Sequence, residues 1–319
     1  MSKQYVIGID MGGTNTVIGV VNARGEILHE SNIKTAIYNT GEEYAEALSN
    51  AVNDLVEKSG LTDQIKGIGI GAPNGNYMTG TLENAANIGW AKGIIVPLAK
   101  MVSDKTGLPC KLTNDANAAA VGEMAYGAAK GMKDFIVITL GTGVGSGIVA
   151  GGQLIVGHDG LAGELGHIIS VKNNGRLCGC GRSGCLETYT SASGVARSAH
   201  EFLSIKETPS LLRKINGRPI TSADVFNAAE EGDELAIEIF NFTGKILGEA
   251  FADFITFSSP EAIILFGGLV GSWKYLQAPI EKSLNENVLV VYKGKTKILR
   301  SELKGAEAAI LGASALGWE

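Results

Sequence analysis

The sequence of 319 residues lacks the features that would assign it to membrane or nucleic-acid-binding proteins. It has no apolar run near the roughly 20 residues that a membrane-spanning helix needs, so we expect no membrane partner. Basic patches are absent too, and the net charge is −6. Because nucleic acids are bound through clustered basic residues, we expect no nucleic-acid partner. No signal or transit segment precedes the first predicted strand at Tyr5, which favours a cytoplasmic location.

Cysteine is scarce, but three of the four cysteines lie within residues 178–185, and His167 precedes them. Zn²⁺ prefers sulfur and nitrogen ligands in a tetrahedral set at about 2.0–2.3 Å. Buried thiols or a redox pair are the alternatives, which the glycines between these cysteines disfavour. A complete set of protein ligands leaves no open position for water. We therefore predict a structural zinc site formed by His167, Cys178, Cys180 and Cys185.

Glycine is abundant, with 44 residues, and it recurs in two similar places. Residues 5–10 and 16–21 are predicted strands joined by a glycine turn, and residues 136–149 repeat this pattern. Predicted strands and helices alternate along the rest of the chain, which indicates an α/β protein. The repeat indicates a duplicated fold.

The two glycine turns are candidate phosphate sites. Backbone N–H groups in such turns can hold phosphate oxygens, and a missing Cβ lets a ligand approach. Many glycine-rich hairpins bind nothing, but the repetition and the Asp10 carboxylate beside the first turn favour a phosphate site. Asp10 can hold Mg²⁺ directly or through water.

Two other nucleotide motifs fail. Residues 293–296 resemble the end of a P-loop, but Leu289 stands where its first glycine is required. Residues 67–72 resemble a dinucleotide-binding pattern, but Pro73 interrupts the helix that should follow.

Polar residues stand at several predicted turns. Asn114 and Asp115 lie where a strand gives way to an alanine-rich helix. Asp115 can cap that helix, or its carboxylate can accept the proton of a hydroxyl that attacks phosphorus, and the local pattern leaves both roles open. Gly75 and Asn87 belong to asparagine-containing segments that suit hydroxyl recognition but also form turns.

The remaining elements follow from hydrophobic periodicity and capping residues. We predict helices over residues 42–59, 96–106, 191–204, 222–230 (capped by Thr221 or Ser222), 234–257 and 306–316, and strands over residues 26–30, 65–70, 110–113 and 262–266.

Several segments resemble, in order and over essentially the whole chain, the motifs of ROK-family sugar kinases. They are residues 10–15 (DMGGTN), 114–117 (NDAN), 140–145 (LGTGVG), 163–167 (GELGH), 178–187 (CGCGRSGCLE) and 266–268 (FGG).

The resemblance implies a two-lobed, actin-like fold of the hexokinase or ribonuclease H type, with ATP and Mg²⁺ in the cleft, and a homodimer. We assign residues 1–112 and 304–319 to a small lobe and residues 113–303, with the zinc segment, to a large lobe. The implied reaction is ATP-dependent phosphorylation of a hexose at its 6-hydroxyl, with glucose as the leading substrate. N-acetylmannosamine, N-acetylglucosamine and fructose are alternatives, and a non-catalytic, sugar-responsive regulator is an alternative of another class.

The resemblance also implies roles for single residues. Asp115 is the expected general base. The expected sugar-binding residues are Gly75, Asn87, Asn114, Asp115, Glu164, His167 and Glu187. The expected nucleotide-binding residues are Asp10, Gly12, Gly13, Thr14, Gly141, Thr142, Gly143, Gly267 and Gly268.

Overall fold

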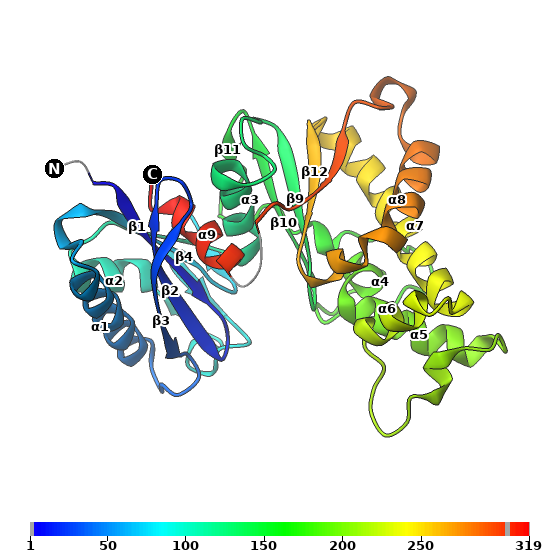
Figure 1. The fold of residues 1–319 in the computed structure, drawn as a ribbon, viewed down its shortest axis with the longest axis horizontal. Coiled ribbons are helices and arrows are strands. Elements are labelled where there is room, and N and C mark those ends of the chain that lie inside the picture. The colour runs from blue at the N-terminus through cyan, green and yellow to red at the C-terminus, as the bar shows by residue number, and fades with distance from the viewer. Residues whose placement is uncertain (1–2, 304–306, 319) are drawn as a thin grey trace. The chain divides into compact units, whose positions relative to one another are not determined.

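The computed structural model describes residues 3–303 and 307–318, and the chain forms two compact units (Figure 1). Unit 1 comprises Met1–Lys133, Gly147–Gly163 and Ser301–Glu319, and unit 2 comprises Asp134–Ser146 and Glu164–Arg300. The predicted small lobe ends earlier, at residue 112, and leaves out Gly147–Gly163. Its second boundary, at residue 304, lies outside the described residues. The lobe assignment therefore stays a prediction.

Unit 1 is built on a sheet with the strand order β3-β2-β1-β4-β8. The strands are β1 (Tyr5–Met11), β2 (Asn15–Asn22), β3 (Ile27–Lys34), β4 (Ile65–Gly71) and β8 (Cys110–Thr113). Neighbouring strands among β1, β2 and β3 are antiparallel, whereas β4 runs parallel to β1 and to β8. A small sheet of β5 (Gly75–Asn76), β6 (Thr81–Glu83) and β7 (Ile95–Val96) also belongs to this unit.

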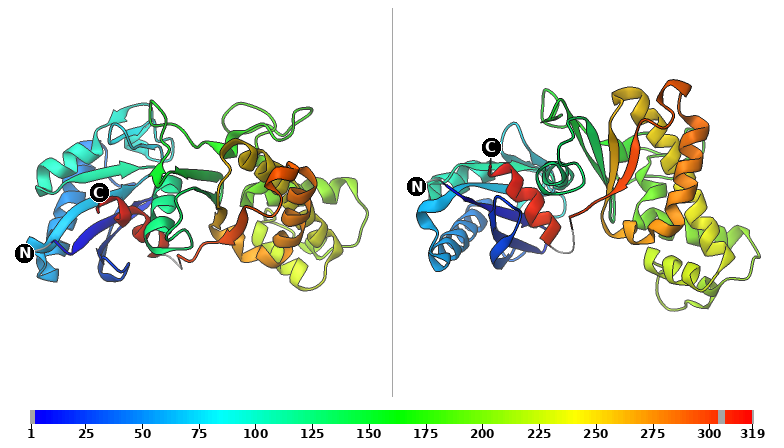
Figure 2. Two further views of the ribbon diagram at one scale, coloured as in Figure 1. Left: turned by 90° about the horizontal axis from the view of Figure 1, so that it is seen from above. Right: turned by 45° about the horizontal axis from the view of Figure 1, so that its top comes forward.

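Helices cover both faces of the unit 1 sheet (Figures 1 and 2). The isoleucines of β1 and β4 pack with α1 (Gly41–Ser59) and α2 (Leu98–Thr106) into one buried core. On the other face, α9 (Glu307–Leu316) packs against β1, β4 and α3 (Asp115–Tyr126). Alternate residues of a strand point to opposite faces, which is why the sequence alternates glycine and isoleucine here.

Glycines allow α9 to approach the sheet and α3 closely. A Cβ on Gly69 would collide with the backbone carbonyl of Ala313 in α9. A Cβ on Gly122 of α3 would lie 2.6 Å from the Cα of Gly312. The glycines at residues 67–71 therefore serve helix packing, in agreement with our rejection of a dinucleotide-binding motif.

The second sheet repeats the first, with the order β11-β10-β9-β12-β13. Its strands are β9 (Phe135–Leu140), β10 (Val144–Ala150), β11 (Gln153–Leu154), β12 (Ala262–Phe266) and β13 (Lys297–Arg300). As in unit 1, the central strands are parallel, because β12 runs parallel to β9 and to β13. The predicted duplication is confirmed. The helices of unit 2 are α4 (Glu187–Thr190), α5 (Ala192–Ile205), α6 (Ser222–Glu230), α7 (Glu234–Ser258) and α8 (Trp273–Asn287).

Most predicted elements are present, with small differences at their ends. β8, α6 and β12 have the predicted bounds, and Thr221 forms a complete capping box for α6. The predicted helix start at residue 306 lies outside the described residues. The sequence did not predict α8 and β13, nor the short elements α4, β5, β6, β7 and β11. Among residues 3–303 and 307–318, no helix is long and apolar enough to cross a membrane.

Candidate active site

The first group of polar residues lies in unit 1, where β8 ends and α3 begins. Asn114 is the N-cap of α3, and its side-chain oxygen accepts a hydrogen bond from the Asn117 N–H at 2.7 Å. Asp115 is the first residue of the helix, and its carboxylate accepts from the Ala116 N–H at 2.8 Å. Asn114, and not Asp115, therefore caps the helix. The Asp115 side chain is left exposed at a helix N-terminus, where the backbone favours negative charge.

Burial raises the pKa of both Asp115 and Asp10, and the charge of Asp115 acts on Asp10. Protein atoms packed around the Asp115 carboxylate desolvate it on all but its open side, and this raises its pKa. Burial also raises the pKa of Asp10 near the end of β1, and the negative charge of Asp115 raises it further. A divalent cation beside these carboxylates would relieve their repulsion, so this donor set fits Mg²⁺.

The first glycine turn lies next to the segment that contains Asn87. The Gly12 N–H donates to the Asn15 carbonyl at 2.9 Å and closes the turn. A Cβ on Gly13 would lie 2.7 Å from the Asn87 carbonyl, so the two backbones touch. Thr14 is exposed, and its carbonyl accepts from the Thr35 N–H at 2.8 Å. The structure thus brings a predicted sugar-binding residue against the predicted phosphate turn.

Gly75 occupies a different kind of position. It is buried, and a Cβ there would collide with the backbone of Thr113, the last residue of β8. Gly75 therefore allows β5 to pack directly against the end of β8.

The second glycine turn lies in unit 2 and is tied to Glu187 of α4. The Gly141 N–H donates to the Gly143 carbonyl at 3.0 Å. The Val144 N–H donates to the Glu187 carboxylate at 2.9 Å, and a Cβ on Gly143 would collide with that carboxylate. Glu187 is therefore fixed against the turn by a charge-assisted hydrogen bond.

Gly267 and Gly268 lie beside the same turn. Gly267 has φ 102°, a conformation that favours glycine, and a Cβ there would lie 2.7 Å from the carbonyl of Leu140. Gly268 has open space around its Cα. The end of β12 is thus adjacent to the end of β9, where residues 141–143 begin.

An open pocket of about 600 Å³ in unit 2 includes Thr142 of the second turn. Its other lining residues come from α5 and from the segment that leads into α6. They are Ala192, Ser193, Ala196, Arg197, His200, Glu201, Pro219, Ile220, Thr221 and Ser222.

The four predicted zinc ligands form one cluster in unit 2. Their ligand atoms all lie within 4.8 Å of one another. The Sγ atoms of Cys180 and Cys185 are 3.6 Å apart, and Cys178 Sγ is 3.7 Å from His167 Nδ1. Zinc bonds of about 2.0–2.3 Å at tetrahedral angles put such ligand atoms about 3.5–3.8 Å apart, so the cluster fits Zn²⁺. A hydrogen bond with the Arg182 backbone lowers the pKa of Cys180 to about 6, which favours the thiolate that metals bind.

The zinc loop, defined here as residues 167–187, brings two predicted sugar-binding residues to this cluster. Cys178 Sγ lies 3.7 Å from the second carboxylate oxygen of Glu187. His167 presents Nδ1 to the cluster, so its Nε2 is the ring nitrogen left for another partner. Glu164, just before the loop, is exposed.

Sequence reasoning missed Arg176, which lies in the zinc loop and is only 6% exposed. The sequence signal that could have indicated it is an arginine between two predicted metal ligands, His167 and Cys178, in a glycine-rich segment. The predicted site residues thus form two groups. Unit 1 contains Asp10, the first glycine turn, Gly75, Asn87, Asn114 and Asp115, and unit 2 contains the second turn, Glu164, the zinc loop, Gly267 and Gly268.

Comparisons with known proteins identify the family of the chain. The chain is 36% identical over 322 residues to the glucokinase of Halalkalibacterium halodurans, covering 100% of this chain and 95% of that protein. It is 32% identical over 269 residues to the N-acetylmannosamine kinase of Escherichia coli strain 55989, covering 83% of each. A solved ROK family glucokinase from Streptomyces griseus, in complex with glucose and AMPPNP, has a TM-score of 0.77 and 34% identity over 98% of both chains. The model of the ROK family matches residues 6–319, and the chain therefore belongs to the ROK family.

Proposed function

We propose that this protein is a glucokinase, which transfers the γ-phosphoryl group of ATP to the 6-hydroxyl of glucose. The main observation in support of this proposal is the exposed Asp115 carboxylate at the N-terminus of α3, beside Asp10 and next to Asn114. Relatives named glucokinase match over almost their full length, which supports glucose as the substrate.

In this proposal Asp115 is the general base. Its carboxylate accepts the proton of the 6-hydroxyl as the oxygen attacks phosphorus. Desolvation raises its pKa and therefore its basicity. Asn114 uses its side-chain oxygen for the helix cap, and its amide N–H groups can donate to a neighbouring sugar hydroxyl.

The other sugar hydroxyls are assigned to Gly75 and Asn87 in unit 1 and to Glu164, His167 and Glu187 in unit 2. Glu187 is held by Val144, and its other oxygen lies close to Cys178. Zinc bound at the Cys/His cluster supplies no reacting group and stabilises the loop. With Nδ1 on the metal, His167 Nε2 carries the N–H that can donate to a hydroxyl.

The nucleotide is assigned to the glycine turns. The amides of residues 12–14 and 141–143 hold the phosphates, and Asp10 holds Mg²⁺, which neutralises charge on the phosphoryl group being transferred. Gly267 and Gly268 lie on the nucleoside side. The open pocket at Thr142 extends away from the second turn and offers room for the rest of the nucleotide. A homodimer and a cytoplasmic location complete the proposal.

ADP release by the purified protein, measured over a panel of hexoses and N-acetylhexosamines, tests the substrate. We expect glucose to have the highest kcat/KM. The similarity to an N-acetylmannosamine kinase makes N-acetylhexosamines the second candidates, and fructose remains on the panel. If an N-acetylhexosamine exceeds glucose by ~10-fold, about 1.4 kcal/mol in transition-state binding, the glucose assignment is wrong. Sugar binding without ADP release from any sugar would instead favour a non-catalytic regulator.

Asp115→Asn tests the general base. The variant keeps the size of the side chain but cannot accept the proton, so turnover should fall by ~10²- to 10⁴-fold while glucose still binds. Turnover close to that of the wild type would rule out this role for Asp115.

A further inference from the structure

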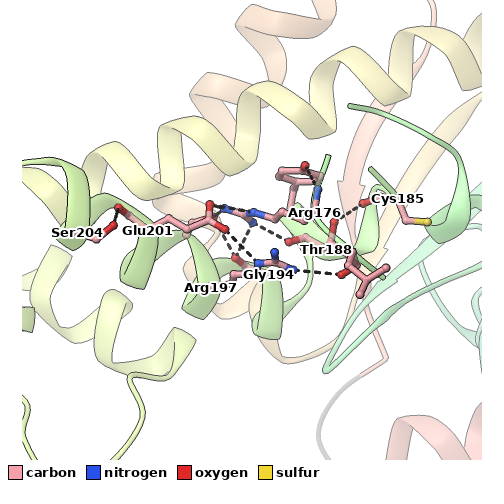
Figure 3. A network of polar contacts seen from close by, with 10 residues as sticks. Arg176, Cys185, Thr188, Gly194, Arg197, Glu201 and Ser204 are labelled. Atoms are coloured by element: carbon pink, nitrogen blue, oxygen red, sulfur yellow. Dashed lines mark hydrogen bonds and ion pairs between the residues drawn. The ribbon is translucent and has the colours of Figure 1, made fainter. Parts of the chain in front are cut away.

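Arg176 is a buried arginine that none of the proposed binding roles uses. It lies in the zinc loop, two positions before the ligand Cys178, and its side chain is 5% exposed. Figure 3 shows its guanidinium at the centre of a network that joins the zinc loop to α4 and α5. A buried arginine is costly unless its donors are paired, so these contacts require an explanation.

The guanidinium makes hydrogen bonds from each of its nitrogens. Nε and Nη2 donate to the Glu201 carboxylate at 3.1 and 2.5 Å, and Nη2 also donates to Ser198 Oγ at 2.9 Å. Nη1 donates to the carbonyls of Thr188 at 2.7 Å and Gly194 at 3.3 Å. The planar guanidinium directs its fork of donors to all of these acceptors at once, whereas the single ammonium group of a lysine could not reach them all.

The contact with Thr188 bears directly on Glu187. Glu187 is the first of the four residues of α4, and so short a helix leaves carbonyl groups without partners inside it. Arg176 supplies a donor to one of these carbonyls, on the residue that follows Glu187. The backbone N–H of Arg176 also donates to the Tyr189 hydroxyl at 2.8 Å, and the guanidinium lies 4.4 Å from the centre of that ring.

A second arginine strengthens the same connection. Arg197 of α5 donates to the other Glu201 oxygen at 3.1 Å and to the carbonyl of Leu177 in the zinc loop at 3.2 Å. The Glu201 carboxylate therefore pairs with both arginines, and the loop is tied to α5 at consecutive residues, 176 and 177.

We propose that Arg176 is a positioning residue for sugar binding: it locks the zinc loop onto α4 and α5 and so fixes the direction of the Glu187 carboxylate. This inference rests on the proposed role of Glu187 as a sugar ligand. Arg176 itself donates to no residue of the glycine turns, although α4 and α5 are bonded to the second turn through Glu187 and Ala192. Loss of Arg176 should therefore weaken the use of sugar more than the use of ATP.

The test compares Arg176→Met, Arg176→Lys and a control, Arg213→Met. Arg213 also donates to backbone carbonyls in unit 2, those of Thr208 and Leu203, each at 3.1 Å, but it lies outside the zinc loop. The KM values for glucose and ATP, kcat, ADP affinity by calorimetry and zinc content are measured for each. Because displacement of about 1 Å can cost ~10²-fold, we expect Arg176→Met to raise the KM for glucose by ~10- to 100-fold. The KM for ATP and the ADP affinity should change much less than the KM for glucose, and the zinc content should stay near the wild-type value.

Arg176→Lys should recover part of the loss, because it restores the charge but not the fork, and Arg213→Met should behave like the wild type. Equal losses of sugar and nucleotide binding in Arg176→Met would show a merely structural role and overturn the proposal, as would an unchanged KM for glucose. If Arg176→Met does not fold, Ser198→Ala decides, since Ser198 accepts a hydrogen bond from Arg176 Nη2 and, unlike Glu201, does not line the pocket at Thr142. It must raise the KM for glucose selectively. If the wild-type protein phosphorylates glucose and the variants have the same KM for glucose, only the role of Arg176 is refuted. If the wild-type protein releases no ADP with any sugar, the proposed function itself is refuted.

Discussion

Replacing Gly122 by alanine tests how closely α3 and α9 must pack to hold Asp115 in place. Alanine is favoured over glycine inside a helix by about 1 kcal/mol, so on helix propensity alone the change should stabilise the protein. The added Cβ, however, would lie 2.6 Å from the Cα of Gly312 and 3.1 Å from its nitrogen, and neither backbone atom can rotate away. Overpacking of a core costs about 1–3 kcal/mol, and a clash between two backbones belongs at the upper end.

The net effect of Gly122→Ala is therefore a loss of about 2 kcal/mol in the free energy of unfolding. For a unit of this size, that loss lowers Tm by about 4–8 °C, which calorimetry measures directly. Gly271→Ala is the matched control, because Gly271 is exposed and has open space around its Cα. Its unfolding free energy should change by no more than about 0.5 kcal/mol. An unchanged or raised Tm for Gly122→Ala would mean that α3 and α9 separate without cost, and the close-packing argument would be wrong.

Other predictions concern the metal and the carboxylates. The purified protein should contain about one zinc per chain, and Cys180→Ser should lose both the metal and the sugar affinity while nucleotide binding persists, as metal analysis and calorimetry would show. Because burial raises the pKa of Asp115, kcat/KM should begin to fall on acidification at a pH above the ordinary aspartate pKa of about 3.9. A fall in kcat/KM only at or below that pH would contradict a desolvated base. A raised pKa in the folded state stabilises the fold fully below the ordinary pKa, and this stabilisation is lost as the pH rises through the raised pKa. Asp115→Asn should therefore have a higher Tm than the wild type at neutral pH, and the difference should vanish towards about pH 3, below the ordinary pKa. An equal Tm at every pH would show that the carboxylate is not desolvated.

The sequence predicted well those features that depend on nearby residues. The cap at Thr221 and the apolar run that forms β12 are local signals, and the structure has both α6 and β12 at the predicted bounds. α8 was missed because Pro279 lies in its middle, where proline removes a helical hydrogen bond. The helix persists because Gly244 of α7 leaves room for the proline ring: a Cβ there would lie 2.7 Å from Pro279 Cγ.

Within the candidate site, the sequence indicated the residue types but not the contacts between distant segments. The bond from Val144 to Glu187 joins residues 43 positions apart, and the Arg176 network depends on α4 and α5 lying against the loop. Periodicity and motif spacing report on neighbours along the chain and carry no such information. The choice between Asn114 and Asp115 as the helix cap also needed the structure, because both side chains are suited to that role.

The position of α9 determines the order in which the protein can fold during synthesis. The strands of unit 1 are translated first, yet the helix that covers one face of its sheet follows all of unit 2 in the chain. Ile310, Leu311 and Leu316 of that helix are buried in the finished unit. Until they leave the ribosome, the glycine-rich face of β1 and β4 lacks the cover of α9, while unit 2 already has every strand and helix it needs. Unit 1, whose strands precede unit 2 in this sequence, is therefore the last to complete its core, and a chaperone that binds the nascent chain has most to protect on that face.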